Sequence, residues 1–153
     1  MFYACNLDCD LGKASPWVRE NVLPQLPPFG GGEWCTREQI RDGILDYLGR
    51  RPVPTELKDL EEKLASYRPE VAVAEPPEFW AYFADYDWVA FCQLWGRMID
   101  LPKGFPMFCL DVKQIAHMRG LTAKDVGLAK PGNEHDALAD ALWTRELYRK
   151  LMT

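Results

Sequence analysis

A histidine and several carboxylates follow one another near the C-terminal end of the chain. His135 comes after a glycine-rich approach and just before a helix-like stretch, and Asp136 and Asp140 are four residues apart. Residues at that spacing share one face of a helix. A histidine at the start of such a helix has the chemistry of a general base toward water, and carboxylates are ligands for hard divalent cations.

A second pair of carboxylates, Asp85 and Asp87, follows the strongest strand pattern of the sequence. Residues 78–83, Glu-Phe-Trp-Ala-Tyr-Phe, are nearly all aromatic or apolar, which is typical of a strand buried on both faces. Ligands of open α/β sheets bind at the carboxyl ends of the strands. Together with the segment around His135, this pair favours metal-assisted hydrolysis of a substrate.

Both segments also have an ordinary structural interpretation. Aspartate and asparagine are favoured at helix N-caps, so Asn133 and one of the Asp85/Asp87 pair are candidates for caps. Carboxylates in a first helical turn are favoured by the helix dipole. His135 would then be a surface residue.

The elements that must position these residues alternate between strand and helix patterns. Ser15 and Thr36 are expected N-caps, and the latter is followed by Gln39 at the third helical position. Strands are expected at residues 2–7, 71–74, 78–83 and 107–110, and helices at 16–23, 36–48, 55–66, 87–98, 112–118 and 134–151. This order predicts an α/β domain with some parallel pairing, and 153 residues is the size of one domain.

Composition excludes several classes of protein. The chain is 48% hydrophobic and 27% charged, so it is not disordered throughout, and no run of about 18 apolar residues predicts a membrane span. A net charge of −5 argues against a protein that coats nucleic-acid phosphates without specificity. The five cysteines form no CxxC pair and no secretory signal is visible, which favours reduced thiols in a cytoplasmic protein over a zinc site.

Several segments, taken in order, resemble a known family. Residues 135–140, His-Asp-Ala-Leu-Ala-Asp, resemble the third motif of the DEDDh 3′-5′ exonucleases, and Tyr86-Asp87 resembles the second. With residues 17–28 and 92–96, the likeness is greatest to the ribonuclease T-like branch that contains the mycobacterial polyadenylate-specific exoribonuclease and its phage relatives. It extends from about residue 2 to residue 150.

The resemblance implies an RNase H-like mixed sheet flanked by helices and a two-metal mechanism. Two Mg²⁺ or Mn²⁺ ions, about 4 Å apart, would hold the scissile phosphate. Asp87 and Asp140 would be metal-ligating carboxylates and His135 the general base. The implied activity is 3′-5′ exoribonuclease hydrolysis of single-stranded or 3′-overhanging RNA.

The family also has a first motif, Asp-x-Glu, on its first strand. The resemblance places residues 2–7 on a later strand, which implies that the first strand or strands and their motif are missing. A misassigned start, a fragment and a natural shortening are all open explanations. Asp8 and Asp10 have the spacing of a substitute motif.

Two further expectations follow from a missing first strand. Exposed strand edges would favour a homodimer. Without the first motif, the alternative to an enzyme is a non-catalytic exonuclease-like module that binds nucleic acid or protein.

Overall fold

The structure is a computed structural model that describes residues 1–49, 76–132 and 135–153. The helix expected at 55–66, the strand expected at 71–74, and Asn133 and Glu134 lie outside the described residues. The described chain contains helices and short parallel strand pairs, as expected for the α/β class.

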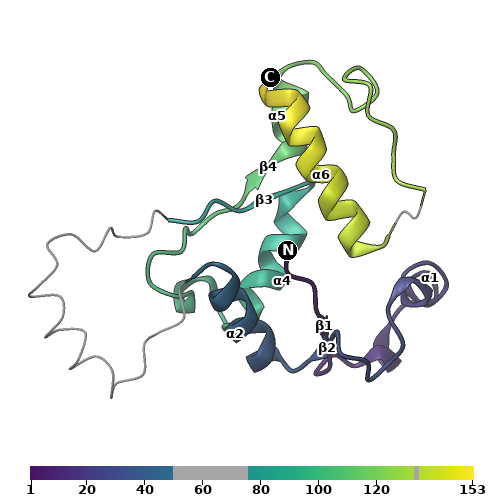
Figure 1. The fold of residues 1–153 in the computed structure, drawn as a ribbon, viewed down its shortest axis with the longest axis vertical. Coiled ribbons are helices and arrows are strands. Elements are labelled where there is room, and N and C mark those ends of the chain that lie inside the picture. Colours follow the sequence, from purple (N-terminus) through teal and green to yellow (C-terminus); the bar gives the residue numbers. More distant parts are fainter. Residues whose placement is uncertain (50–75, 133–134) are drawn as a thin grey trace, which may run out of the picture.

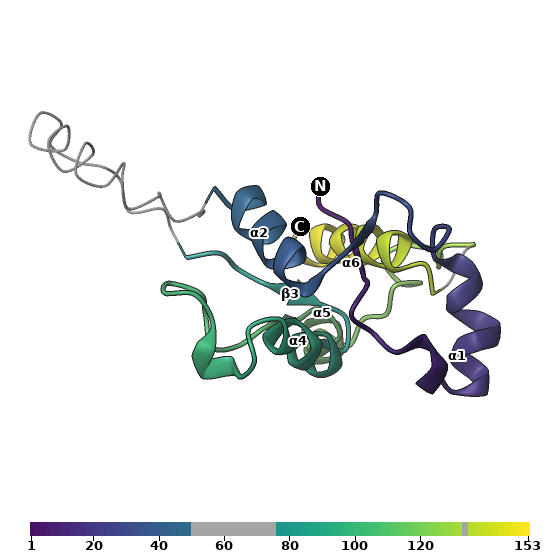
Figure 2. The ribbon, with the colours of Figure 1, turned by 90° about the horizontal axis from the view of Figure 1, so that it is seen from below.

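The C-terminal part is built on two short parallel strands and the helices that follow them. Strand β3 (Trp80–Ala81) pairs with β4 (Leu110–Asp111), with Trp80 opposite Leu110. Helix α4 (Ala84–Gln93) follows β3, α5 (Val112–Met118) follows β4, and α6 (Ala137–Met152) ends the chain. Seen from below, α6 lies on one side of β3 and α4 on the other (Figure 2).

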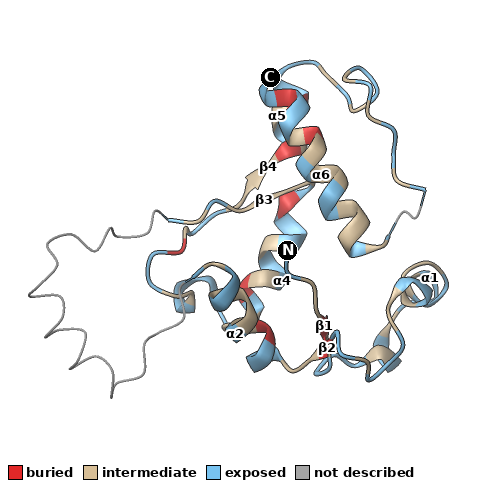
Figure 3. Cartoon of the chain, viewed as in Figure 1, coloured by how far each residue is buried: buried red, intermediate tan, exposed pale blue. Residues whose placement is uncertain are grey.

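The best-buried side chains among the described residues lie between α5 and α6. Val112 on α5 is 0% exposed, and Leu147 and Leu151 on α6 are each 1% exposed. Trp80 of β3 packs against this cluster. Figure 3 shows buried positions along α5 and α6. Burying a leucine side chain stabilises a fold by about 1.5–3 kcal/mol, so this cluster fixes α6 against the β3–β4 pair.

A second apolar group surrounds the far end of α4. Its members are aromatic side chains whose ring centroids lie 4.7–6.3 Å apart, namely Phe79, Trp88, Phe91, Trp95 and Phe105. The short 3-10 helix η3 (Met98–Asp100) follows α4. This group packs α4 against the loop that leads to β4.

The N-terminal part has its own pair of parallel strands. Strand β1 (Cys5–Asn6) pairs with β2 (Trp34–Cys35), and between them lie α1 (Pro16–Asn21) and the 3-10 helices η1 (Leu11–Lys13) and η2 (Leu23–Gln25). Helix α2 (Arg37–Tyr47) follows β2. Figure 1 shows α1 at the edge of the molecule, away from α4.

Local caps explain where the N-terminal helices begin. The Ser15 side chain accepts from the Val18 N–H at the start of α1. Thr36 and Gln39 form the expected capping box at the start of α2. Gly43 lets the ring of Phe2 lie close against α2, because a Cβ at this position would meet the end of that ring.

Several expected boundaries were wrong. Where strands were expected at 2–7, 78–83 and 107–110, the structure has the two-residue strands β1, β3 and β4, and β4 extends one residue past the expected end. Strand β2 was not expected. Helix α4 begins at Ala84, three residues before the expected start, because its N–H groups are satisfied by a carboxylate from a distant strand. The described residues form two separate two-stranded sheets in place of one mixed sheet.

None of the helices in the described part has the length and apolar character that a membrane span needs.

Candidate active site

The carboxyl ends of β3 and β4 lie at the same edge because the two strands are parallel. Each strand is followed at once by a helix, α4 after β3 and α5 after β4. Backbone N–H groups at two helix starts therefore converge at this edge. This is the place at which α/β folds bind ligands.

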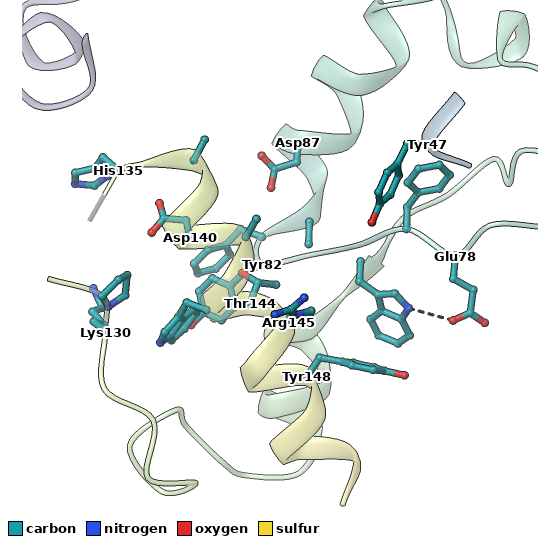
Figure 4. A pocket seen from close by; sticks show the side chains of 18 residues that line it. Tyr47, Glu78, Tyr82, Asp87, Lys130, His135, Asp140, Thr144, Arg145 and Tyr148 are labelled. Atoms are coloured by element: carbon teal, nitrogen blue, oxygen red, sulfur yellow. Dashed lines mark hydrogen bonds between the residues drawn. The ribbon is translucent and has the colours of Figure 1, made fainter. Parts of the chain in front are cut away.

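Asp87 lies in the first turn of α4. The chain enters this helix through Phe83, which has a left-handed backbone with φ of 61°. Phe83 provides no side-chain cap, and Asp85 does not cap the helix either, because it lies inside the first turn. The expected capping role of Asp85 or Asp87 is thus wrong, and the Asp87 side chain enters the pocket described below (Figure 4).

Asp111, at the end of β4, supplies the missing cap. Its carboxylate accepts hydrogen bonds from the N–H groups of Phe83 and Ala84, each at 3.3 Å, and from the N–H of Lys113 at 2.7 Å. Sequence analysis missed this residue. An aspartate between a strand and a helix signals an N-cap, but nothing in the sequence indicates its contact with a helix 27 residues away.

Asp140 lies in the first turn of α6. The cap of this helix is Asp136, whose carboxylate accepts from the Ala139 N–H at 2.7 Å. The helix therefore begins at Ala137, three residues after the expected start, and its N-cap is Asp136. The expected cap, Asn133, lies outside the described residues. The carboxylate of Asp136 is thus engaged, whereas Asp140 lines the pocket.

His135 lies outside the helix, directly before its cap. Its backbone is left-handed, with φ of 75°, a conformation uncommon for residues other than glycine. Its ring makes a T-shaped contact with the ring of Trp17 from α1, with centroids 4.9 Å apart and planes at 80°. This contact joins the N-terminal part of the molecule to the start of α6.

One pocket of about 1260 Å³ brings Asp87, His135 and Asp140 together. Figure 4 shows Asp87 on α4 and the other two at the start of α6. Within the described residues no hydrogen bond or ion pair joins these three side chains. Lys130 and Arg145 also line the pocket, and the rest of its wall is largely aromatic, including Trp80, Tyr82, Trp143 and Tyr148.

The site concentrates negative charge. Partial burial raises the pKa of the Asp87 carboxyl, and the nearby charge of Asp111 raises it further. Burial and the charges of Asp87 and Asp111 also raise the pKa of the Cys109 thiol to about 11. A negative charge is disfavoured at this edge, so a bound cation would be favoured there.

The donor set suits a hard divalent cation but is small. Within residues 1–49, 76–132 and 135–153, no group of three or more histidine, cysteine, aspartate or glutamate side chains is close enough to hold a metal ion. Mg²⁺ is often bound by one or two carboxylates, with water and substrate phosphates as the other ligands. The oxygen donors Asp87 and Asp140 fit that pattern.

Asp8 and Asp10 lie elsewhere. The Asp8 carboxylate accepts from the Arg37 N–H at 2.7 Å at the start of α2, and Asp10 accepts from the Gly12 N–H at 3.0 Å. Neither lines the pocket. The structure does not bring them to Asp87 and Asp140, so their interpretation as a substitute first motif is wrong.

Two proteins from Mycobacterium tuberculosis, one from strain CDC 1551 and one from strain H37Rv, are similar to this chain. Both are named 3′-5′ exoribonuclease, and each is 36% identical to it over 140 residues. The match covers 92% of this chain and 69% of each relative. No family model matches the chain. On the strength of this identity and coverage, the chain belongs to the 3′-5′ exoribonuclease family.

Proposed function

We propose that the chain is a metal-dependent 3′-5′ exoribonuclease of the DEDDh type with an RNase H-like fold. One observation carries this proposal: Asp87, His135 and Asp140, which resemble family motifs far apart in the sequence, line one pocket at the end of β3. The names of the two mycobacterial relatives support the same activity.

His135 is the group that moves a proton in this proposal. A water oxygen attacks the phosphorus of the terminal phosphodiester, and the imidazole accepts the proton that this water loses. The bond between phosphorus and the 3′ oxygen of the preceding nucleotide breaks, and that oxygen takes a proton from solvent. The products are a nucleoside 5′-monophosphate and an RNA shortened by one nucleotide.

Asp87 and Asp140 are the proposed ligands of Mg²⁺ or Mn²⁺. A bound ion would supply charge stabilisation at the scissile phosphate. The two carboxylates enter from different helices, so they can hold a cation between α4 and α6. Further ligands would come from water, from substrate phosphate oxygens or from residues outside the described ranges.

The rest of the pocket suits single-stranded RNA. Lys130 and Arg145 provide positive charge for backbone phosphates, and the aromatic wall offers faces on which bases can stack. A volume of about 1260 Å³ exceeds what a single bound ion needs. We therefore propose that the 3′-terminal nucleotides occupy this pocket.

A non-catalytic exonuclease-like module is the second candidate. It is favoured by the absence of a three-donor metal group among the described residues. In that case the pocket would bind a nucleic-acid end without cleaving it.

The proposal is tested with a 5′-labelled single-stranded RNA incubated with the chain in Mg²⁺, in Mn²⁺ or in chelator. We expect a ladder that shortens from the 3′ end in either metal and no shortening in chelator. Asp87→Asn should abolish the ladder, and Asp85→Asn is the matched control in the same helical turn. Retention of full-length RNA by a folded chain that still binds it would favour the second candidate.

A further inference from the structure

A single carboxylate joins the starts of two helices at the candidate active site. Asp111 caps α5, with its Oδ1 accepting from the Lys113 N–H at 2.7 Å. The same Oδ1 accepts from the Phe83 N–H, and Oδ2 accepts from the Ala84 N–H, each at 3.3 Å. Asp111 therefore makes one local contact and two contacts with the start of α4.

Helix α4 depends on this distant carboxylate. Its own N-cap residue, Phe83, makes no side-chain cap hydrogen bond and has a left-handed backbone. The first N–H groups of a helix need acceptors, and a left-handed residue other than glycine persists only where its surroundings hold it. Within the described residues, Asp111 is the side chain that provides these acceptors.

The backbone that Asp111 holds is the backbone that carries Asp87 into the pocket. Ala84 precedes Asp87 by three residues, so both lie at the first turn of α4 and on the same face of the helix. A displacement of the Ala84 end of the helix would move the Asp87 carboxylate relative to Asp140 on α6. Asp111 itself does not line the pocket.

We infer that Asp111 is a positioning residue that sets the place of Asp87 by holding the start of α4. The inference rests on the proposed exoribonuclease function, because Asp87 must act there for its position to matter. Asp111 would act through the backbone N–H groups that it accepts from, and not by direct contact in the pocket. Asp111 also links β4 and α5 to the start of α4.

Two substitutions separate this role from ordinary capping of α5. Serine is as good an N-cap as aspartate, but its shorter side chain does not extend to α4. Asp111→Ser therefore keeps the bond to Lys113 and loses those to Phe83 and Ala84. Asp111→Asn removes the charge but keeps the shape and one acceptor oxygen. We therefore expect it to keep part of the hydrogen bonding to the Phe83 and Ala84 N–H groups.

The experiment compares steady-state RNA degradation with backbone amide hydrogen exchange in the full chain. For Asp111→Ser we expect kcat to fall roughly ten- to hundredfold, as for small displacements of catalytic groups, with KM within about twofold of wild type. Exchange should become faster at Phe83 and Ala84 but not at Lys113. Asp111→Asn should have an intermediate kcat. Asp125→Ser, which removes a carboxylate that caps a turn at Thr122, should match wild type.

The outcomes are distinct. A wild-type kcat in Asp111→Ser, with faster exchange at Phe83 and Ala84, would overturn the positioning role and leave the proposed function intact. Equal kcat losses in Asp111→Ser and Asp111→Asn would assign the effect to charge and also overturn it. An inert wild-type chain would overturn the proposed function and this inference with it. If Asp111→Ser does not fold, the exchange and kcat of Asp111→Asn decide by the same criteria.

Discussion

The carboxylates and the histidine of the pocket are held in different ways. Asp87 and Asp140 each lie in the first turn of a helix, and α6 is fixed through the buried Leu147 and Leu151. His135 lies before its helix with a left-handed backbone, and its ring contact is with Trp17 on the edge helix α1. Two of the three groups are therefore held by regular structure, and the third is held by a contact between distant parts of the chain.

This difference matches the chemistry proposed for each group. A cation needs ligands at fixed positions, and helices that pack on a buried core provide them. A general base must approach the attacking water, and a residue outside the helices can move without unfolding them. We therefore expect the carboxylates to be sensitive to substitution and to core packing, and His135 to be sensitive to its contact with α1.

The largest effect on activity is expected from Asp140→Asn, as for the Asp87→Asn variant described above. Removing a ligand charge should lower kcat by roughly a thousandfold or more, since metal-based charge stabilisation contributes several kcal/mol. Single-turnover degradation of labelled RNA measures this loss. The exposed Asp125→Asn is the control, and an Asp140→Asn variant with more than a tenth of wild-type activity would remove this residue from the site.

His135→Ala should lower kcat by about 10²–10⁴-fold, the usual contribution of a general base. Its Tm should fall only slightly, because the residue is exposed, lies outside α6 and loses only the ring contact with Trp17. His117, the other histidine of the chain, is exposed on α5, and His117→Ala provides a matched control. Equal rates for the two variants would exclude His135 as the base.

Leu147→Ala tests the core that holds α6. Removing a leucine that is 1% exposed should lower the free energy of unfolding by about 2–5 kcal/mol. Denaturant unfolding followed by circular dichroism measures the change. Leu142, on the same helix but 37% exposed, is the control, and Leu142→Ala should cost far less.

A smaller effect is expected from Trp17→Ala. An aromatic pair contributes about 0.5–1.5 kcal/mol, so losing the contact with His135 should lower kcat by about two- to tenfold. Trp17→Phe should recover most of the activity, and the exposed Phe29→Ala should leave it unchanged. An effect of Trp17→Ala that persists in the His135→Ala background would show that Trp17 acts through another residue.

The smallest effect concerns the stability of the Asp87→Asn variant. The pKa of Asp87 is raised in the fold, so its charged form is disfavoured and wild-type stability increases as pH falls through that pKa. At pH 7 the variant should therefore have a Tm equal to or slightly above wild type, and this difference should shrink as the pH falls through the raised pKa of Asp87. A clearly lower Tm at pH 7 would contradict the electrostatic account.

The helix starts show how much of the fold the sequence could predict. Ser15 and Thr36 cap their helices as expected, because capping depends on residues three or four positions apart. The start of α4 could not be predicted, because its cap comes from Asp111 on another strand. The expected strands were too long, because the residues of an aromatic run such as 78–83 can pack in an apolar cluster without pairing in a sheet.

For the candidate site, the sequence could indicate which residues to consider, but their catalytic and metal-binding roles stay predictions. Asp87, Asp140 and His135 were chosen from motifs, and the structure places all three in one pocket. Sequence analysis missed Asp111, Lys130 and Arg145, because each has its role only through neighbours distant in the sequence. The metal, the homodimer and the cytoplasmic location stay predictions.

The most direct test of the central claim is a crystal structure of the chain grown with Mn²⁺ and a nucleoside 5′-monophosphate, with anomalous diffraction to locate the metal. The account predicts an anomalous peak in contact with the carboxylates of Asp87 and Asp140, with the phosphate of the nucleotide beside it. A well-ordered pocket with no peak, or a peak bound by neither carboxylate, would contradict the account.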